Sequence, residues 1–148
     1  MVKKENLILE GIILAVIVTG LMLFFHIKNR EVNLCRYLFN GLVSGNYGAA
    51  RFIDWDNLKA LDLDVAEVYD RLPSEKEQAN YKRAFINGFA VGFSRVKARA
   101  KAFNNWRIYT KDSEETVVAA DYKGQNKTLL FTLSRYGEPR LKAIQWEE

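Results

Sequence analysis

The feature that most constrains this chain is a continuous apolar run near its start, LILEGIILAVIVTGLMLFFHI, over residues 7–27. The run is 21 residues long, and Glu10 is its one charged residue. As an α-helix it would be about 31 Å long, which matches the hydrocarbon thickness of a bilayer. A helix in the core of a soluble protein rarely runs this long without a polar face. We therefore predict a transmembrane helix over residues 7–27, preceded by a short tail over residues 1–6.

The flanks of this run indicate a single-pass anchor in the cell membrane. A secretory cleavage site ends in small residues, whereas the segment LMLFFHIKN is bulky. Basic residues lie on both sides of the run, so the positive-inside rule does not decide the orientation. Because the preceding tail is short, we expect it to stay in the cytoplasm and the C-terminal domain to lie outside. The residues expected at the membrane interfaces are Glu10, His26, Lys28 and Arg30.

The segment KKENLILEGIILAVIV resembles the start of a type IV pilin, with two lysines and a glutamate inside an apolar stretch. The glycine that the pilin-processing peptidase needs would fall at Glu5, so the resemblance implies a degenerate signal. Gly41 and Gly45 also interrupt the long continuous helix of a pilin. The alternative is that Glu10 lies one turn inside the interface and extends its carboxylate to water.

Composition narrows the chemistry of the rest of the chain. Cys35 is the lone cysteine and His26 the lone histidine of the 148 residues. One cysteine excludes an internal disulfide and a cysteine metal cluster. One histidine leaves most general-base and zinc schemes without their central group. We therefore expect no metal and no cofactor.

Helical signals dominate residues 31–103. Apolar residues at helical spacing predict an amphipathic helix from about residue 31 that ends near Gly45. Two short helices are expected over residues 52–61 and 63–72, with Asp54 and Asp64 as N-caps. Ser74 and Glu77 form a capping box for a long helix. Its apolar stripe contains Phe85, Phe89, Gly92, Phe93, Val96, Ala100 and Phe103.

A run of alternating basic residues, SRVKARAKAF, ends that predicted helix. On a helix these side chains would border the apolar stripe and cover its edges with their long stems. The candidate basic surface consists of Arg95, Lys97, Arg99 and Lys101. Gly88 and Gly92 lie four residues apart on the same helix, a spacing that lets a neighbouring helix or strand approach closely.

From about residue 105 to residue 147 the period changes from helical to two. The segments WRIYTK, TVVAADYK, KTLLFTLS and RLKAIQW are rich in β-branched and aromatic residues and are separated by turn signals. They predict a four-stranded antiparallel meander. The fold class is therefore α+β, with an N-terminal transmembrane helix followed by helices packed on a curved sheet.

The segments YLFNGLVSGNYGAARFIDW, NWRIYTKDSEETVVAADYKG and AIQW resemble the nuclear-transport-factor-like, or cystatin-like, cone fold. The resemblance implies a conical pocket between helix and sheet, and similarity to the membrane-anchored scaffold subunits of secretion and conjugation channels. An enzyme on this fold would need an inward carboxylate, and Asp121 lies beside Tyr122 on a strand. Neighbours on a strand point to opposite faces, so both cannot line one cavity. The candidate pocket residues are Phe85, Phe89, Phe93, Trp106, Tyr109, Tyr122 and Phe131.

Charge is segregated along the domain. Residues 54–77 hold eight acids and three bases, whereas residues 78–111 hold eight bases and no acid. Nucleic-acid binding would want a basic face without an acidic screen, so we expect no nucleic-acid partner. This segregation of charge suits binding to protein neighbours of complementary charge better than binding to nucleic acid.

We therefore expect residues 28–148 to be a non-catalytic binding or assembly module of a larger membrane complex. Its expected partners are the lipid bilayer and other membrane-protein subunits. Whether it also forms a homo-oligomer is left open. Two alternatives are a membrane-tethered small-ligand binder or enzyme that uses the aromatic cone, and a pilin-like subunit.

Overall fold

A computed structural model describes the backbone of residues 2–96 and 99–148, and the side chains of this range except those of residues 2–7 and 28. The chain divides into two compact units, Met1–Arg30 and Glu31–Glu148, which are treated separately below.

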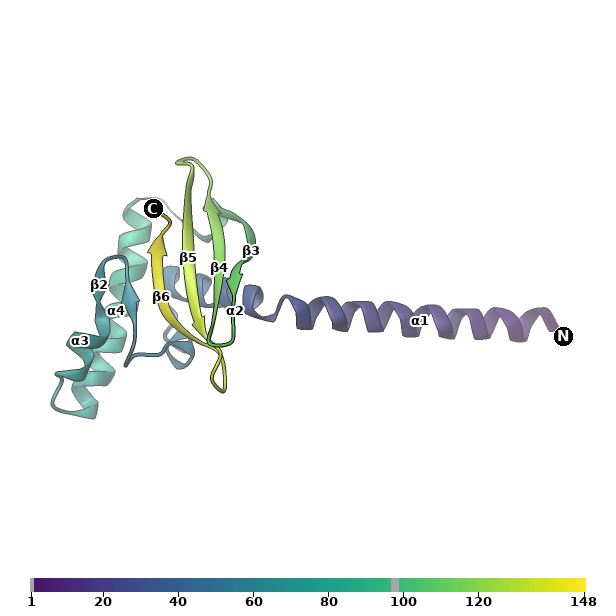
Figure 1. The fold of residues 1–148 in the computed structure, drawn as a ribbon, viewed down its shortest axis with the longest axis horizontal. Helices are drawn as coiled ribbons and strands as arrows, with labels where there is room; N and C mark the ends of the chain where they lie inside the picture. The colour runs from purple at the N-terminus through teal and green to yellow at the C-terminus, as the bar shows by residue number, and fades with distance from the viewer. Residues whose placement is uncertain (1, 97–98) are drawn as a thin grey trace. The chain divides into compact units, whose positions relative to one another are not determined.

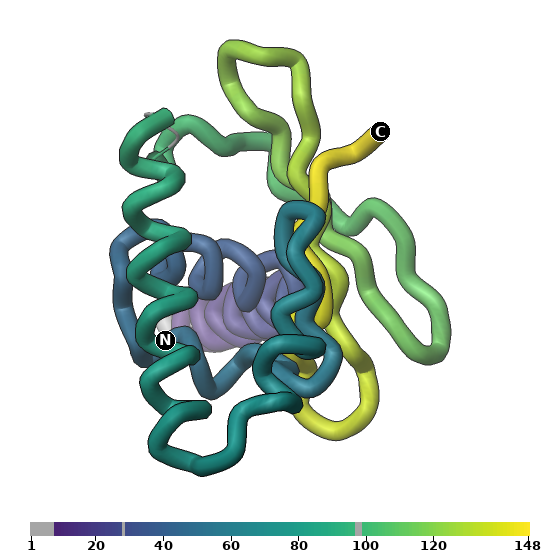
Figure 2. The backbone as a smooth tube through the Cα atoms, turned by 90° about the vertical axis from the view of Figure 1, so that its left-hand side faces the viewer, coloured from purple at the N-terminus to yellow at the C-terminus, as the bar shows by residue number. Residues whose placement is uncertain are grey.

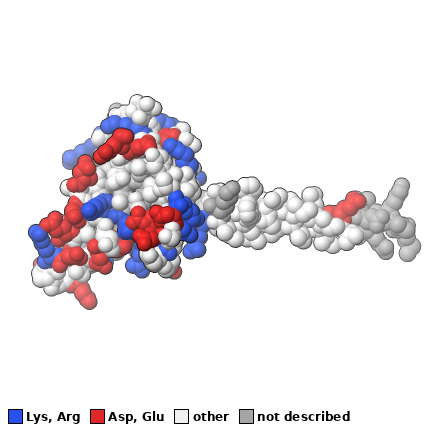
Figure 3. All heavy atoms as spheres, in the orientation of Figure 1, with Lys and Arg blue, Asp and Glu red and all other residues white. Residues whose placement is uncertain are grey.

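The first unit is the helix α1 (Val2–Lys28), labelled in Figure 1. Its segment Ile8–Ile27 has a mean hydropathy of 2.5 and is long and apolar enough to cross a membrane. The side chains of this segment are exposed, and apart from Glu10 its surface carries no charge (Figure 3). No residue of that segment is buried against another part of the described structure.

The second unit is an α+β domain, as the sequence predicts. Its helices are α2 (Arg30–Val43), the 3-10 helix η1 (Tyr47–Phe52), α3 (Val65–Asp70), α4 (Glu75–Arg95) and the 3-10 helix η2 (Ala100–Ala102). Helices α2 and α4 lie on one side of the sheet (Figure 2). The layers are joined by aromatic side chains, because Phe39 of α2 contacts Phe93 of α4 and Phe131 of the sheet.

Several helix boundaries confirm the capping predictions. The Asp64 side chain accepts a hydrogen bond from the Glu67 backbone N–H at 3.1 Å and begins α3. Ser74 accepts from the Glu77 backbone N–H at 3.3 Å and begins α4. Helix α2 ends two residues before Gly45, whose φ of +70° suits glycine.

The sheet has six strands, not the four predicted, and it is open. The four meander strands are β3 (Phe103–Lys111), β4 (Glu115–Tyr122), β5 (Lys127–Ser134) and β6 (Arg140–Trp146). Two short strands, β1 (Lys59–Ala60) and β2 (Leu63–Asp64), extend the sheet beyond β6, giving the order β2-β1-β6-β5-β4-β3. All neighbours are antiparallel except β1 and β6, which are parallel.

The helix predicted over residues 52–61 is wrong. Ile53 instead forms a bridge to Leu141, a turn follows, and β1 begins at Lys59. Asp54 is not a helix N-cap; its backbone N–H donates to the Leu141 carbonyl at 2.9 Å. Pairing with β6 therefore takes precedence over the local helical spacing in this segment.

The prediction that the long helix continues to Phe103 is also wrong. Helix α4 ends at Arg95, and Phe103 begins β3, where it pairs with Tyr122. Asn105 has a positive φ of +50°, but it lies at a register shift within β3 and not at a helix end. The helical spacing of Phe103 is outweighed by its burial beneath Phe39, whose ring centroid lies 4.7 Å away.

Candidate functional site

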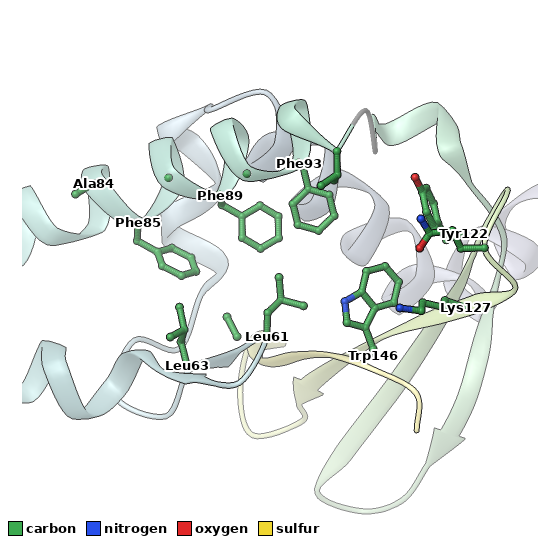
Figure 4. Close-up of a pocket in the computed structure, with 14 residues that line it drawn as sticks. Leu61, Leu63, Ala84, Phe85, Phe89, Phe93, Tyr122, Lys127 and Trp146 are labelled. Carbon is green, nitrogen blue, oxygen red and sulfur yellow. The ribbon is translucent and has the colours of Figure 1, made fainter.

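An apolar groove runs along one side of α4 and has a volume of about 570 Å³ (Figure 4). This volume is within the range of cavities that bind small molecules in proteins. Three parts of the domain form its walls: α4, the β1–β2 hairpin, and the strand ends of β4, β5 and β6. The lining residues are Ala60, Leu61, Leu63, Ala84, Phe85, Gly88, Phe89, Gly92, Phe93, Val96, Tyr122, Gln125, Lys127 and Trp146.

The helical wall of the groove follows from four-residue spacing. Phe85, Phe89 and Phe93 form one column on α4 and point into the groove (Figure 4). Phe89 and Phe93 stack with ring centroids 4.6 Å apart, which limits the freedom of both rings. The aromatic column is therefore a stiff wall.

Gly88 and Gly92 carry no side chains, so the surface of α4 beside the aromatic column is recessed. A Cβ atom added at Gly88 or Gly92 would meet no other atom within 4 Å. The expectation that these glycines admit a closely packed helix or strand is therefore wrong for the described structure. They instead leave space that larger side chains would occupy.

The opposite wall is the β1–β2 hairpin, which sequence reasoning missed. Leu61 and Asp62 form its turn with positive φ angles of 49° and 70°. The Leu61 backbone N–H donates to the Ile144 carbonyl of β6 at 2.8 Å, which attaches the hairpin to the sheet. Leu63 lies on the groove side and is 65% exposed. The sequence alone offered no signal for this wall, because the position and exposure of Leu63 are known only once the hairpin is placed.

One end of the groove is polar. Tyr122 and Lys127 are opposite each other on β4 and β5, and Gln125 lies in the turn between these strands. The Lys127 ammonium lies 5.8 Å from the centroid of the Trp146 ring (Figure 4). Among the described side chains, Lys127 forms no ion pair, and no acidic residue lines the groove.

The seven aromatic candidates divide among three places. Phe85, Phe89, Phe93 and Tyr122 line the groove. Phe131 is fully buried in the interior, and the half-buried Trp106 stacks on it with ring centroids 5.3 Å apart. Tyr109 is exposed and donates a hydrogen bond to the Glu147 carboxylate at 2.6 Å, which raises the pKa of the phenol. The groove therefore differs from the predicted pocket, which all seven aromatic side chains would line.

Asp121 does not line the groove beside Tyr122. This agrees with the prediction that neighbouring residues of a strand point to opposite faces. Its carboxylate accepts hydrogen bonds from Asn105 at 2.7 Å, Arg107 at 2.9 Å and Thr128 at 3.0 Å. The Asn105 amide and the Arg107 guanidinium lower the pKa of this carboxyl group. The described walls of the groove offer apolar surface, a phenol, an amide and an ammonium. These groups can bind a ligand through apolar contacts and hydrogen bonds.

The basic candidates do not share one helix face. Arg95 is the last residue of α4, whereas Arg99 and Lys101 lie in the following connection, and all three are exposed. Lys97 lies outside the described residues. The prediction that these residues border a helical stripe is therefore wrong, because the helix has ended.

The membrane-interface candidates belong to the α1 region. Glu10 and His26 are exposed residues of α1, and Arg30 is the exposed first residue of α2. The side chain of Lys28 lies outside the described residues. Within the described part of the chain, no His, Cys, Asp and Glu side chains group as metal ligands.

The chain was also compared with known proteins. No protein-family model, curated protein sequence or solved structure matches it.

Proposed function

We propose that this chain is a single-pass membrane protein whose extramembrane domain binds a small apolar ligand in the groove beside α4. The single observation that carries the proposal is the groove itself: an open, aromatic-walled space of about 570 Å³. The interior next to the groove is filled, because Phe39 packs against Phe103, Trp106 and Phe131. A ligand in the groove would cover the half-buried aromatic side chains that line it, Phe85, Tyr122 and Trp146.

The anchor is proposed from α1. The segment Ile8–Ile27 exposes apolar side chains along its whole length, an arrangement that water disfavours and a bilayer accommodates. We propose the C-terminal domain on the extracytoplasmic side. The anchor would keep this domain attached to the membrane.

The order of elements in the domain supports a likeness to the nuclear-transport-factor-like cone fold. A first helix, a hairpin, a short helix and a long helix precede an antiparallel meander. In such a fold the space between long helix and sheet is where a ligand would enter, and the groove occupies that space here.

A second candidate function is an assembly subunit of a larger membrane complex, similar to channel scaffold subunits. Charge segregation favours it, because residues 54–77 are predominantly acidic and residues 78–111 carry no acid. Such a domain can dock oppositely charged neighbours. In that case a side chain of a partner subunit would fill the groove.

Photocrosslinking in intact membranes tests both candidates with the full chain. Leu63 lines the groove and is 65% exposed, so it can be replaced by the photoreactive amino acid benzoylphenylalanine with little cost. Val91 is 50% exposed, lies on α4 outside the groove and is the matched control position.

The ligand-binding proposal expects an adduct at position 63 that changes the intact mass without a visible shift on a denaturing gel. A protein-sized shift specific to position 63 would contradict it and support the assembly subunit. Equal crosslinking at positions 63 and 91, or none at position 63, would count against the groove as a binding site.

A further inference from the structure

We infer that the ligand of the groove is a single-chain anionic amphiphile of the fatty-acid type, with its head at Lys127 and its chain along α4. This inference rests on the proposed function, because it names the chemistry of the ligand in the same groove. It is carried by the polarity, the charge and the length of the space.

Polarity changes from one end of the groove to the other. The end beside Phe85 and Leu63 is apolar, whereas Tyr122 and Lys127 lie at the other end (Figure 4). Gln125, in the turn between their two strands, also lines the groove. A ligand that matches both ends has an apolar body and a polar head. Binding sites of this kind hold the body by apolar contact and orient it through a few polar groups.

Charge selects the sign of the head group. Lys127 is the one charged residue among the described residues that line the groove. The Glu147 carboxylate accepts a hydrogen bond from the Tyr109 hydroxyl of β3 at 2.6 Å, and among the described residues it forms no ion pair with Lys127. The Lys127 ammonium donates hydrogen bonds to anions, and its strand partner Tyr122 brings a phenol to the same end of the groove. A carboxylate head therefore suits this end.

Length favours an extended chain over a compact molecule. Phe85 and Val96 mark the two ends of the helical wall, which are 11 residues apart and therefore about 16 Å apart along the axis. A hydrocarbon chain is about 4 Å across at the usual contact distance between carbon atoms. One such chain can lie along Phe85, Phe89 and Phe93 within the available volume.

The test uses photoactivatable probes in native membranes that contain the full chain. The probes are a diazirine fatty acid, the corresponding fatty alcohol, and a two-chain anionic phospholipid with the same diazirine chain. Labelled peptides are mapped by mass spectrometry. Labelling of α1 reports delivery of each probe to the bilayer, so groove labelling is expressed relative to it.

We expect the fatty acid to label the peptides that contain Phe89 and Trp146 more strongly than the alcohol or the phospholipid does. Lys127→Glu should lower this labelling at least about fivefold, since it replaces an attraction by a repulsion. Lys123→Glu is the control, because Lys123 is exposed in the same hairpin and does not line the groove. Gly88→Leu should lower labelling by acid and alcohol alike, since it adds a side chain to open space.

The outcomes separate this inference from the proposed function. If Gly88→Leu blocks labelling but Lys127→Glu has no effect, the groove binds an apolar ligand and the anionic amphiphile is wrong. Stronger labelling by the alcohol or the phospholipid overturns the inference in the same way. If all probes label α1 and none labels the groove, both the inference and the proposed function fail.

Discussion

Phe39 of α2 packs edge to face against Phe131 of β5, with ring centroids 5.6 Å apart, and neither side chain reaches solvent. This contact joins the helical layer to the sheet. It also closes the interior next to the groove, since Phe39 further contacts Phe93, whose ring lines the groove. The same aromatic cluster therefore stabilises the fold and positions one wall of the candidate site.

The Phe39 contact predicts a large stability loss on truncation. Phe39→Ala should lower the free energy of unfolding by about 3 to 5 kcal/mol, because it removes a buried ring and leaves a cavity. Denaturant unfolding followed by tryptophan fluorescence measures this change. Tyr136→Ala is the control, since Tyr136 is 75% exposed. A loss for Phe39→Ala no larger than that of the control would contradict the packing described here.

Two helical glycines should respond to alanine with opposite signs. A Cβ atom at Gly41 would lie 2.9 Å from the Ala49 Cβ of η1, so Gly41→Ala should destabilise the domain by about 1 to 3 kcal/mol through overpacking. Gly88→Ala adds a Cβ to open space and should stabilise it by about 1 kcal/mol through helix propensity. Thermal unfolding of the two variants side by side checks this prediction, and a shift of the same sign in both would refute it.

Thr116 offers a stabilising substitution. Its hydroxyl is fully buried and has no hydrogen-bond partner among the described residues. Burying an unpaired hydroxyl costs about 1 to 3 kcal/mol in protein interiors, so Thr116→Val should raise the free energy of unfolding by roughly 1 kcal/mol. Thr132→Val, at a half-buried position of β5, is the comparison. A destabilised Thr116→Val variant would mean that the hydroxyl is paired in the protein.

Asp121 should contribute stability that depends on pH. Hydrogen bonds from Asn105 and Arg107 lower its pKa below the ordinary value of 3.8, so the folded state favours the carboxylate. This contribution is present above the unfolded pKa and is lost as the pH falls through the lower folded pKa. Asp121→Asn should therefore cost about 1 kcal/mol at pH 7, after allowance for solvent screening, and progressively less below about pH 4. Chemical denaturation at a series of pH values measures the difference, and a cost that does not change with pH would contradict it.

Cys35 should resist thiol reagents on either side of a membrane. It is fully buried in α2, and burial together with the nearby Glu31 carboxylate raises the pKa of the thiol. The thiolate is the reactive form, so labelling by an impermeant maleimide should require unfolding. A labelled native Cys35 would contradict its burial.

The inert Cys35 permits a test of orientation. Ser113 is exposed in the turn between β3 and β4, so Ser113→Cys introduces an accessible thiol without removal of Cys35. If the domain lies outside the cytoplasm, the impermeant maleimide should label this variant in intact cells. Labelling that needs permeabilised cells would place the domain in the cytoplasm and overturn the proposed orientation.

Local sequence signals predicted the elements that depend on neighbours in the chain. The caps at Asp64 and Ser74 were predicted because a side chain three residues from its partner N–H needs no distant contact. The four meander strands were predicted from their period-two spacing and their β-branched and aromatic residues, which are properties of each segment alone. The end of α4 was misplaced because Phe103 matches the helical period and yet pairs with Tyr122 on the sheet.

The candidate site was predicted in its helical wall and at Tyr122 of β4, and not elsewhere. Phe85, Phe89 and Phe93 share one face of a helix at any helical geometry, so their spacing was sufficient. Trp106 and Phe131 were assigned to the same pocket because a sequence does not show which face of a sheet Phe39 will fill. Leu63, Lys127 and Trp146 were not candidates at all, although each lines the groove.

By itself the sequence determined an apolar helix long enough to span a membrane, an α+β domain after it, and the caps and periodicities of most elements. These properties depend on composition and on spacing within a few residues. The tertiary structure decided that β1 and β2 pair beside β6, that Phe39 fills one part of the interior, and that a groove with a single ammonium remains in another part. Those outcomes depend on contacts between residues far apart in the chain, whose energies no local pattern records.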